Sequence, residues 1–376
     1  MNQHQKHIVW VLANSTSAPY FTWFAELVAK KKDFRLSFIC MFREKPVMIQ
    51  QMQSLGFECH WIPYDWNKRK IHMISAWVKM RRLLRKIKPD VVHSHLFDDS
   101  LVTMVAAASL GIPKRVVTKG DASYHYFHTP RWTRFDRLIN RKATDIIALS
   151  NESRSFIIEK ENANAAKVHL VHHGLNISAV TAQNEEVKKE MKSKWNLDSK
   201  CVVGSVSRFI PWKGYMDIVD VVKRVTDVNR NVRFLFCGSG EQEQMVRDKV
   251  KSLHVEDYVA FTGPIPADQM PSLYGVMNVF LHAAHYEPFG LVIAEAMLNG
   301  IPVVSTKTGA AGDAVISGEH GYLCEYGNTQ ALADSILKLT DANLALNMGQ
   351  KCIPRATEMF SIETGYQNHL KIYQQD

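Results

Sequence analysis

Short and almost uninterrupted apolar runs alternate with helical stretches along this chain, and the alternation occurs twice. The first half contains HIVWVLA, RLSFICMF, FECHWIP, DVVHSH, KRVVTK and TDIIALS, and the second contains VVGSVSRF, VRFLFCG, YVAFTG, NVFLHAA and PVVST. Runs of Val, Ile and Phe without polar alternation are typical of parallel strands buried on both faces. Such strands separated by helices predict an α/β protein built from two doubly wound parallel sheets.

The length of 376 residues suits two domains of ordinary size. The seam is expected in residues 176–200, where EEVKKEMKSKW is a charged helix with no obvious core face. We therefore predict an N-terminal domain over 1–175 and a C-terminal domain over 176–359, with a last helix, 360–376, that crosses back to the first. In such folds ligands bind where strands end, at the carboxyl edge of the sheet.

Composition excludes several classes of protein. An apolar content of 46% and a charged content of 22% are globular values. The six cysteines form no CxxC pair, which argues against a disulfide framework and against a zinc site. No apolar stretch approaches the roughly 20 residues that span a bilayer, and the N-terminus lacks a signal-peptide pattern. We expect a cytoplasmic protein.

Charge is distributed unevenly. Residues 1–178 hold 27 Lys and Arg against 14 Asp and Glu, a net charge of +13, whereas the remainder has a net charge of −4. Much of the excess lies in residues 66–88, WNKRKIHMISAWVKMRRLLRKIK, where apolar residues have partial helical spacing. This segment fits peripheral contact with an anionic membrane, at the inner face of the cell membrane. A solvated outer helix explains the pattern nearly as well. No nucleic-acid recognition motif accompanies the charge.

The segment YEPFGLVIAEAMLNG, residues 286–300, carries two carboxylates, Glu287 and Glu295. Pro288 and Gly290 indicate a turn, and LVIAEAML indicates a helix that begins after the glycine. The backbone N–H groups at Phe289, Gly290 and Leu291 would then be available to an anion at the helix N-terminus. The segment predicts a site for a negatively charged, hydroxyl-rich ligand. An ordinary helix with a capping acid is the alternative.

Other polar motifs follow the remaining second-half strands. Arg208 and Lys213 flank a loop that contains a proline and can converge on a diphosphate. The later strands are followed by Gly238-Ser239-Gly240, by Thr262-Gly263-Pro264-Ile265, and by the turn TGAAGD at 308–313. Each alone is more typical of a structural turn, but their succession at strand ends favours one shared ligand site.

These motifs resemble a known family. The segments SRFIPWKGY, CGSG, FTGPIP, YEPFGLVIAEAM, IPVVSTKTGAAGDAV, ISGEHGYLCEYGN and ATDIIALSN are similar to those of retaining glycosyltransferases of family four, with the GT-B fold of two Rossmann-like domains facing a cleft. The resemblance covers roughly residues 85–375, and its strongest part is 200–330. It implies a donor-binding second domain and an acceptor-binding first domain.

The resemblance also implies a role for each donor-site residue. Arg208 and Lys213 would stabilise the departing nucleotide diphosphate, and Glu287 would bind hydroxyls of the donor sugar. Glu295 would accept hydrogen bonds from the ribose, and Phe289, Gly290 and Leu291 would approach the sugar and phosphate through their backbone. The loop Thr262–Ile265 would contact the base, and Gly238 and Gly240 would lie close to the nucleotide. Because Arg208 and Lys213 supply positive charge, neither a metal ion nor another cofactor is expected.

The first half departs from the family pattern at two points. The loop after the first strand, residues 14–19, lacks glycine, although Ser15 and Thr16 retain backbone amides. The position at which many relatives carry a histidine is Gly120, between Lys119 and Asp121. Asp121 or His125 could substitute, and His95 is a weak acceptor-site candidate. An aromatic set interleaved with basic residues could stack on the acceptor or face lipid, or pack on the sheet; its members are Tyr124, Tyr126, Phe127, Trp132 and Phe135.

The sequence as a whole predicts a metal-independent, retaining glycosyltransferase. Its donor would be a UDP- or GDP-sugar, and its acceptor a glycan or a lipid-linked molecule in polysaccharide or glycoconjugate biosynthesis. A GT-B sugar-nucleotide epimerase is an alternative. So is an inactive sugar-nucleotide-binding protein, which the missing histidine makes conceivable.

Overall fold

A computed structural model describes residues 5–13, 19–120, 122–198 and 200–375. The chain divides into two compact units, of which unit 1 comprises residues 1–174 and 362–376 and unit 2 comprises residues 175–361. The last helix, α17 (Ile362–Gln374), therefore belongs to the same unit as the N-terminal strand.

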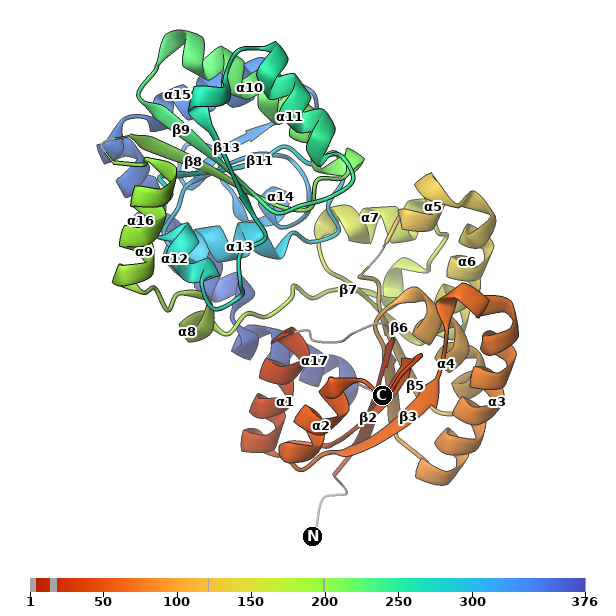
Figure 1. The fold of residues 1–376 in the computed structure, drawn as a ribbon. Coiled ribbons are helices and arrows are strands. Elements are labelled where there is room, and N and C mark those ends of the chain that lie inside the picture. The colour runs from red at the N-terminus through yellow and green to blue at the C-terminus, as the bar shows by residue number, and fades with distance from the viewer. Residues whose placement is uncertain (1–4, 14–18, 121, 199, 376) are drawn as a thin grey trace. The chain divides into compact units, whose positions relative to one another are not determined.

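Unit 1 is built on a seven-stranded parallel sheet (Figure 1) with the strand order β3-β2-β1-β4-β5-β6-β7. This is a doubly wound order: the chain adds β2 and β3 on one side of β1 and then adds β4 to β7 on its other side. The strands are β1 (His7–Ala13), β2 (Arg35–Phe42), β3 (Glu58–Pro63), β4 (Val91–Ser94), β5 (Lys114–Thr118), β6 (Asp145–Ala148) and β7 (Val168–Leu170).

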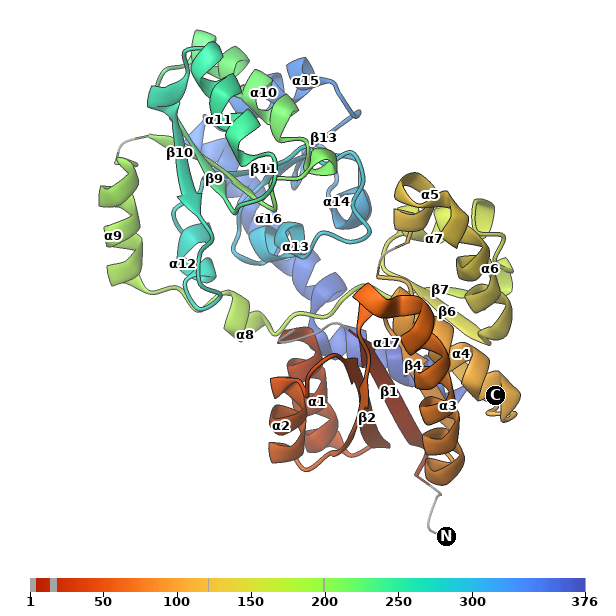
Figure 2. The ribbon, with the colours of Figure 1, turned by 45° about the vertical axis from the view of Figure 1, so that its right-hand side comes forward.

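Helices cover both faces of this sheet (Figure 2). They are α1 (Pro19–Lys31), α2 (Val47–Ser54), α3 (Arg69–Ile87), α4 (Phe97–Ser109), α5 (Tyr124–His128), α6 (Thr133–Lys142), α7 (Asn151–Glu159) and α17. Alternate residues of β1 face opposite layers, as the twofold period of a strand requires. Val9 and Val11 belong to the core cluster formed with α3, α4 and α6. Trp10 instead packs against Phe24 of α1, and its indole N–H donates to the Tyr373 hydroxyl of α17 at 2.9 Å.

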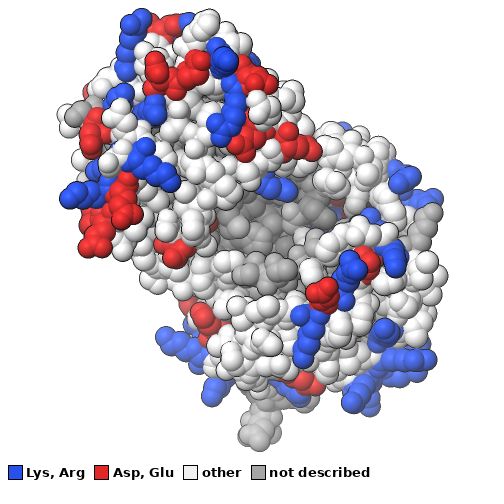
Figure 3. Space-filling view, in the orientation of Figure 1, with Lys and Arg blue, Asp and Glu red and all other residues white. Residues whose placement is uncertain are grey.

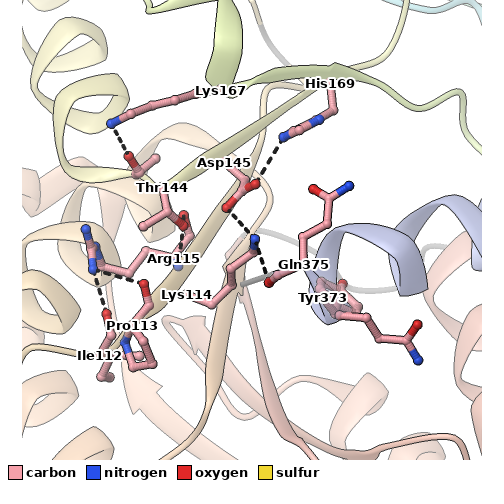
Figure 4. A network of polar contacts seen from close by, with 12 residues as sticks. Ile112, Pro113, Lys114, Arg115, Thr144, Asp145, Lys167, His169, Tyr373 and Gln375 are labelled. Carbon is pink, nitrogen blue, oxygen red and sulfur yellow. Dashed lines mark hydrogen bonds and ion pairs between the residues drawn. The ribbon is translucent and has the colours of Figure 1, made fainter.

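Polar contacts fix α17 to the edge of the sheet where β5, β6 and β7 begin (Figure 4). Lys114 pairs with Asp145 at 3.2 Å and donates to the Gln375 carbonyl oxygen at 3.2 Å. Asp145 also pairs with His169 at 3.0 Å. Burial alone would raise the pKa of Asp145, but these partners outweigh burial and lower it. The network joins the C-terminal helix to strands that are far away in sequence.

Unit 2 is built on a six-stranded parallel sheet with the order β10-β9-β8-β11-β12-β13. The strands are β8 (Cys201–Val206), β9 (Val232–Cys237), β10 (Val259–Gly263), β11 (Val279–His282), β12 (Val303–Thr306) and β13 (Gly321–Cys324). The helices are α8 (Ile177–Val180), α9 (Glu185–Trp195), α10 (Tyr215–Val228), α11 (Glu243–Ser252), α12 (Met270–Tyr274), α13 (Leu291–Leu298), α14 (Gly309–Ala314), α15 (Thr329–Leu339) and α16 (Ala342–Phe360).

Every apolar run that the sequence offered as a strand forms one, and two strands were missed. β7 and β13 each lie at one edge of their sheet and have only three and four residues, with polar residues within or beside them. The charged helix α9 does have a core face, because Met191 and Trp195 are buried. Within α3, the apolar stripe that could have met a membrane mostly packs inward. Leu84 is buried, and Trp77, Leu83 and Ile87 contact the core of unit 1.

Candidate functional site

Loops that follow neighbouring strands meet at the carboxyl edge of the unit 2 sheet. β8 and β11 are adjacent, and the chain runs from β8 towards β10 on one side and from β11 towards β13 on the other. This reversal creates the switch point at which doubly wound sheets bind ligands. Lys213 follows β8 and Glu287 follows β11, so the two candidate charges lie on either side of the switch point.

The Lys213 ammonium forms an ion pair with the Glu287 carboxylate, and both side chains are largely buried. His282 Nε2, at the end of β11, lies 3.3 Å from Glu287 Oε2, although its angle is not that of a directed hydrogen bond. Burial alone would raise the pKa of Glu287, but His282 and Lys213 outweigh it and lower the pKa to about 2. Burial lowers the pKa of His282. At neutral pH the site therefore holds a carboxylate, an ammonium and a neutral imidazole.

Close backbone packing joins the loop after β8 to the loop after β11. The His285 N–H donates to the Trp212 carbonyl oxygen at 2.9 Å. Gly214 has φ of 71°, and a Cβ there would lie 1.9 Å from the Ala283 carbonyl oxygen. Only glycine fits a left-handed position with that clearance. Gly214 thus sets the position of Lys213, its neighbour in the chain.

The turn after β12 supports the loop that carries Glu287. The Ala310 N–H donates to the Phe289 carbonyl oxygen at 2.6 Å. A Cβ at Gly309 would lie 2.4 Å from that same oxygen and 2.7 Å from the Glu287 carbonyl oxygen. The glycine turn at 308–313 therefore packs against the loop that carries Glu287.

Helix α13 begins directly after Gly290, which has φ of 84°. The N–H groups of Gly290 and Leu291 have no acceptor within the described part of the chain, as expected for the first turn of a helix. The Phe289 side chain is 3% exposed and packs against Phe360. Phe289 can therefore meet a ligand only through its backbone, whereas Gly290 and Leu291 present free donors.

Glu295 lies within α13 and accepts a hydrogen bond from the Tyr274 hydroxyl at 2.6 Å. Burial raises the pKa of Glu295, and the Tyr274 hydrogen bond opposes this in part. Tyr274 belongs to α12 and is 1% exposed. The tyrosine fixes the carboxyl group and leaves it capacity to accept further hydrogen bonds.

Arg208 is exposed, and its guanidinium has no hydrogen-bond or ion-pair partner among the residues that the structure describes. The two loop glycines beside it are required for packing. A Cβ at Gly238 would lie 2.1 Å from the Ser207 carbonyl oxygen, and a Cβ at Gly240 would lie 2.4 Å from the Phe209 carbonyl oxygen. These glycines hold the loop after β9 against the loop of Arg208. Their nearness to a nucleotide stays a prediction.

The Thr262–Ile265 loop ends β10 beside these glycines. The Gly238 N–H donates to the Gly263 carbonyl oxygen at 3.1 Å, and the Thr262 hydroxyl donates to that oxygen at 2.8 Å. Pro264 is exposed and Ile265 is half-buried. The structure thus brings all the donor-site candidates to one edge of one sheet.

The unit 1 candidates are largely engaged within the unit. His95 is buried between the rings of Trp10 and His93, with centroids 4.7 and 4.2 Å away. Lys119 is 3% exposed and pairs with Asp136 at 2.7 Å and Glu161 at 3.1 Å. His125 is 7% exposed and also pairs with Asp136, at 2.9 Å. These contacts give Lys119 and His125 a structural role, and any contact with an acceptor stays a prediction.

Gly120 has room for a side chain, because a Cβ there would lie 3.5 Å from its nearest neighbour, the His95 carbonyl oxygen. Ser15, Thr16 and Asp121 lie outside the described residues. The aromatic set divides: Trp132 and Phe135 pack against the core of unit 1, whereas Tyr124, Tyr126 and Phe127 are exposed by 45%, 40% and 60%.

Sequence reasoning missed two residues that contact the candidate carboxylates, His282 and Tyr274. His282 is the last residue of the buried strand β11, and the sequence shows no partner for it. Tyr274 lies 21 residues before its partner Glu295. Only the contact between α12 and α13 in the folded unit reveals that pair.

Comparisons with known proteins agree with this architecture. The family model described as "Glycosyltransferase Family 4" matches residues 25–179, and that described as "Glycosyl transferases group 1" matches residues 187–359. A capsular polysaccharide biosynthesis glycosyltransferase, CapM of Staphylococcus aureus, is 29% identical over 83% of this chain and 85% of its own length. The N-acetyl-alpha-D-glucosaminyl L-malate synthase of Bacillus anthracis is 32% identical over 49% of this chain and 48% of its own length.

Solved structures of low sequence identity share the fold. Anabaena HepE, solved in complex with UDP, superposes with a TM-score of 0.80 at 20% identity and covers 98% of this chain and 99% of its own. The sucrose-phosphate synthase of Thermosynechococcus elongatus gives a TM-score of 0.79 at 18% identity, with 98% of each chain covered. The fold is GT-B, and with family models matched in both units the chain belongs to the glycosyltransferases of family four.

Proposed function

We propose that this glycosyltransferase transfers a sugar, with retention at the anomeric carbon, from a UDP- or GDP-sugar to a glycan or lipid-linked acceptor. The process served would be cell-surface polysaccharide or glycoconjugate biosynthesis. The observation that carries the proposal is the meeting of Lys213 and Glu287 at the switch point of unit 2. Beside them lie an unpaired Arg208 and the free N–H groups of Gly290 and Leu291.

Each part of this arrangement suits one part of a nucleotide sugar. Arg208, Lys213 and the α13 N–H groups supply positive potential for the diphosphate, whose charge grows as the glycosidic bond breaks. Glu287 can accept hydrogen bonds from sugar hydroxyls, and Glu295, fixed by Tyr274, can accept them from the ribose. Because protein cations meet the leaving group, we propose that the reaction needs no metal ion and no other cofactor.

The relatives support the nucleotide-sugar donor and the glycan acceptor. HepE is described with UDP and with UDP and glucose, and a relative from Mycobacterium tuberculosis, 28% identical over 69% of this chain, is a GDP-mannose-dependent alpha-mannosyltransferase. The name of CapM refers to capsular polysaccharide biosynthesis. These names leave both UDP and GDP as candidate donors.

A thermal-shift screen with UDP, GDP, ADP and their common sugars tests the donor. A ligand at 100 times its Kd stabilises the native state by about 2.7 kcal/mol, so one nucleotide series should raise Tm selectively. Arg208→Ala should leave the Tm of the free protein unchanged, because Arg208 has no partner in the described structure, and should reduce the shift. Arg230→Ala, at another exposed arginine, is the matched control. If no nucleotide shifts Tm, the proposed donor site is wrong.

The same preparation separates the enzymatic alternatives. A transferase should release nucleoside diphosphate when a suitable acceptor is present. An epimerase would change the sugar of the donor without an acceptor. A binding protein would show the Tm shift with neither transfer nor slow hydrolysis.

We further propose that unit 1 contacts an anionic membrane through a surface formed by Trp61, Trp66, Ile71 and Ile74. Their side chains are exposed by 39%, 40%, 73% and 70%. Exposed cations lie near them in the chain, namely Arg43, Lys45, Lys68 and Lys79, together with the exposed acid Glu44. Exposed apolar side chains with cations in the same segments fit an interfacial contact with anionic lipid. In the described residues, no helix has the length and hydropathy needed to cross a bilayer.

Replacing Ile71 and Ile74 by serine should weaken binding to phosphatidylglycerol vesicles in a flotation assay. Burying one such side chain contributes about 1.5 kcal/mol or more, so a loss of about tenfold per isoleucine is expected. Val228→Ser with Leu346→Ser removes exposed apolar groups of similar size from unit 2 and should have no effect. Equal flotation of all three proteins would exclude this surface.

A further inference from the structure

A basic groove lies in unit 1 between helix α6 and the segment that leads into β7. Its volume is about 410 Å³, and its lining includes the cations Arg134, Arg137, Arg141 and Lys167. Lys167 directly precedes β7, and Arg141 lies near the end of α6, shortly before β6. The groove therefore approaches the edge of the sheet where strands begin, whereas nucleotide sites of such sheets lie where strands end.

Helical spacing places the three arginines on one side of α6. Positions 134, 137 and 141 are three and four residues apart, so they form one row along the helix. Asp136, the single carboxylate within α6, is 4% exposed and is engaged by Lys119 and His125. The row of arginines thus faces the groove while the acid of the same helix pairs with the interior.

No carboxylate is among the lining residues of the groove, and none of its four cations has an ion pair within the described chain. Other surface cations do pair with an acid, such as Lys223, Arg247 and Lys249 of unit 2. Figure 3 shows Lys and Arg gathered over the part of unit 1 where α3 and α6 lie, with few acids among them. Unpaired cations that line a concave surface favour an anionic ligand.

Arg137 and Lys167 are partly oriented by backbone contacts. Arg137 Nη2 donates to the Lys160 carbonyl oxygen at 3.3 Å, and Lys167 Nζ donates to the Ala143 carbonyl oxygen at 3.0 Å (Figure 4). Each retains further N–H groups, because a guanidinium has five and an ammonium has three. The groove thus offers donors whose positions are already restricted, which favours binding.

We propose that this groove binds an acidic sugar, a hydroxylated ring bearing a carboxylate or a phosphate group, where the sugar part of the assignment rests on the glycan acceptor proposed above. The arginines and Lys167 bind the anionic group. A volume of about 410 Å³ is of the size that ligand pockets have, roughly 300–1,000 Å³. The site would hold an acidic unit of a glycan. Because it lies in unit 1, it does not depend on the donor site proposed in unit 2.

Calorimetric titration of the full chain tests this site with four probes: glucose 6-phosphate, glucuronate, glucose and inorganic phosphate. The two acidic sugars should bind at least tenfold more tightly than glucose, and glucose 6-phosphate several-fold more tightly than inorganic phosphate. Arg137→Glu with Arg141→Glu should weaken both acidic sugars by tenfold or more. Lys189→Glu with Lys192→Glu makes the same change of charge on the exposed face of α9 and should leave affinity unchanged.

Several outcomes would overturn the proposal. Equal affinity in the wild type and the arginine variant would do so, as would equal affinity for inorganic phosphate and glucose 6-phosphate. Binding that is lost in Lys213→Ala but kept in the arginine variant would assign these probes to the donor site instead. Arg137→Ala with Arg141→Ala repeats the test without charge reversal, and circular dichroism confirms that each variant folds.

A lipid headgroup is the other source of phosphate. Phosphatidylglycerol vesicles that retain the wild type but release the arginine variant, together with no binding of soluble acidic sugars, would identify a membrane as the occupant. That result would also overturn the sugar assignment. A failed nucleotide shift with intact binding of acidic sugars would contradict the proposed donor and leave this groove unaffected.

Discussion

Replacing Lys213 by alanine is expected to lower kcat by about 100- to 1,000-fold, the typical cost of removing one group that stabilises developing charge. The substitution removes the cation nearest to Glu287 and leaves Arg208 as the remaining cation of that loop. Initial rates with a saturating nucleotide sugar, measured as release of nucleoside diphosphate, would show the loss. Lys213→Arg keeps the charge and should recover part of the rate.

The same substitution has a structural consequence that must be measured separately. Glu287 is 7% exposed, and without Lys213 its charge would have only His282 beside it. Breaking a fully buried pair costs roughly 3–5 kcal/mol, but Lys213 keeps a 14% exposed side chain, so a loss of about 1–3 kcal/mol is expected. Urea unfolding would give this value and show whether the variant is folded under assay conditions.

Glu287→Ala is the matched substitution at the other end of the pair. It should abolish transfer as well, because the proposed contact with the donor sugar disappears. The double variant should lose less unfolding free energy than the sum of the two single changes, since each single change already breaks the pair. Undiminished turnover in both single variants would falsify the roles proposed for Lys213 and Glu287.

The strands of the two sheets could be predicted because they are buried on both faces. HIVWVLA and VRFLFC consist of residues that leave no ambiguity about burial, and both form strands of at least six residues. β7 and β13 could not be predicted in this way. These two edge strands have only three and four residues; VHL contains a polar histidine, and GYLC lies between His320 and Glu325. Tertiary pairing, more than local pattern, makes them strands.

The candidate site, like the strands, could be predicted from the sequence only in part. Spacing indicated that Arg208, Lys213, Glu287 and Glu295 follow different strands, and parallel strands bring such residues to one edge. The sequence could not show that Lys213 and Glu287 pair with one another or that Gly309 packs beneath Phe289. It predicted that the glycines of CGSG lie close to the nucleotide, which stays a prediction, but it could not show that both glycines are also required for contact with the loop of Arg208. Glycine patterns alone do not separate these two roles.

Unit 1 contains a cluster of four histidines that should make it sensitive to acid. His93, His95, His173 and His369 gather around Trp10, Tyr20 and Tyr373. Burial lowers the pKa of each, to about 4 for His173 and His369 and well below the usual 6.5 for the other two. His93 bonds to the hydroxyls of Tyr373 and Thr118, and His369 donates to the Gly365 carbonyl oxygen. All four are therefore neutral in the folded protein near pH 6.

The sign of the effect follows from proton binding. Below pH 6.5 the unfolded chain protonates these histidines, whereas in the folded unit His173 and His369 are protonated only near pH 4 and the pKa values of His93 and His95 are also well below 6.5, so stability falls as pH falls below 6.5. At pH 5, His369 alone should lower the free energy of unfolding by about 2 kcal/mol relative to pH 7.5. The four together should lower it by several kcal/mol, a large part of the total for an ordinary domain.

Urea unfolding of the full chain at pH 7.5, 6.5, 5.5 and 5.0 measures this dependence, followed by tryptophan fluorescence, because six of the eight tryptophans lie in unit 1. His369→Gln keeps a donor for the Gly365 carbonyl oxygen but cannot be protonated, so the slope near pH 5 should decrease by about 1.2 kcal/mol per pH unit. His128→Gln, at an exposed position of the same unit, should leave the slope unchanged.

The same slope in the wild type and His369→Gln would show that this histidine does not lose its proton on folding. The acid sensitivity would then have to come from His93, His95 and His173, or, at lower pH, from carboxylates such as Asp136, whose pKa is lowered because Lys119 and His125 outweigh burial.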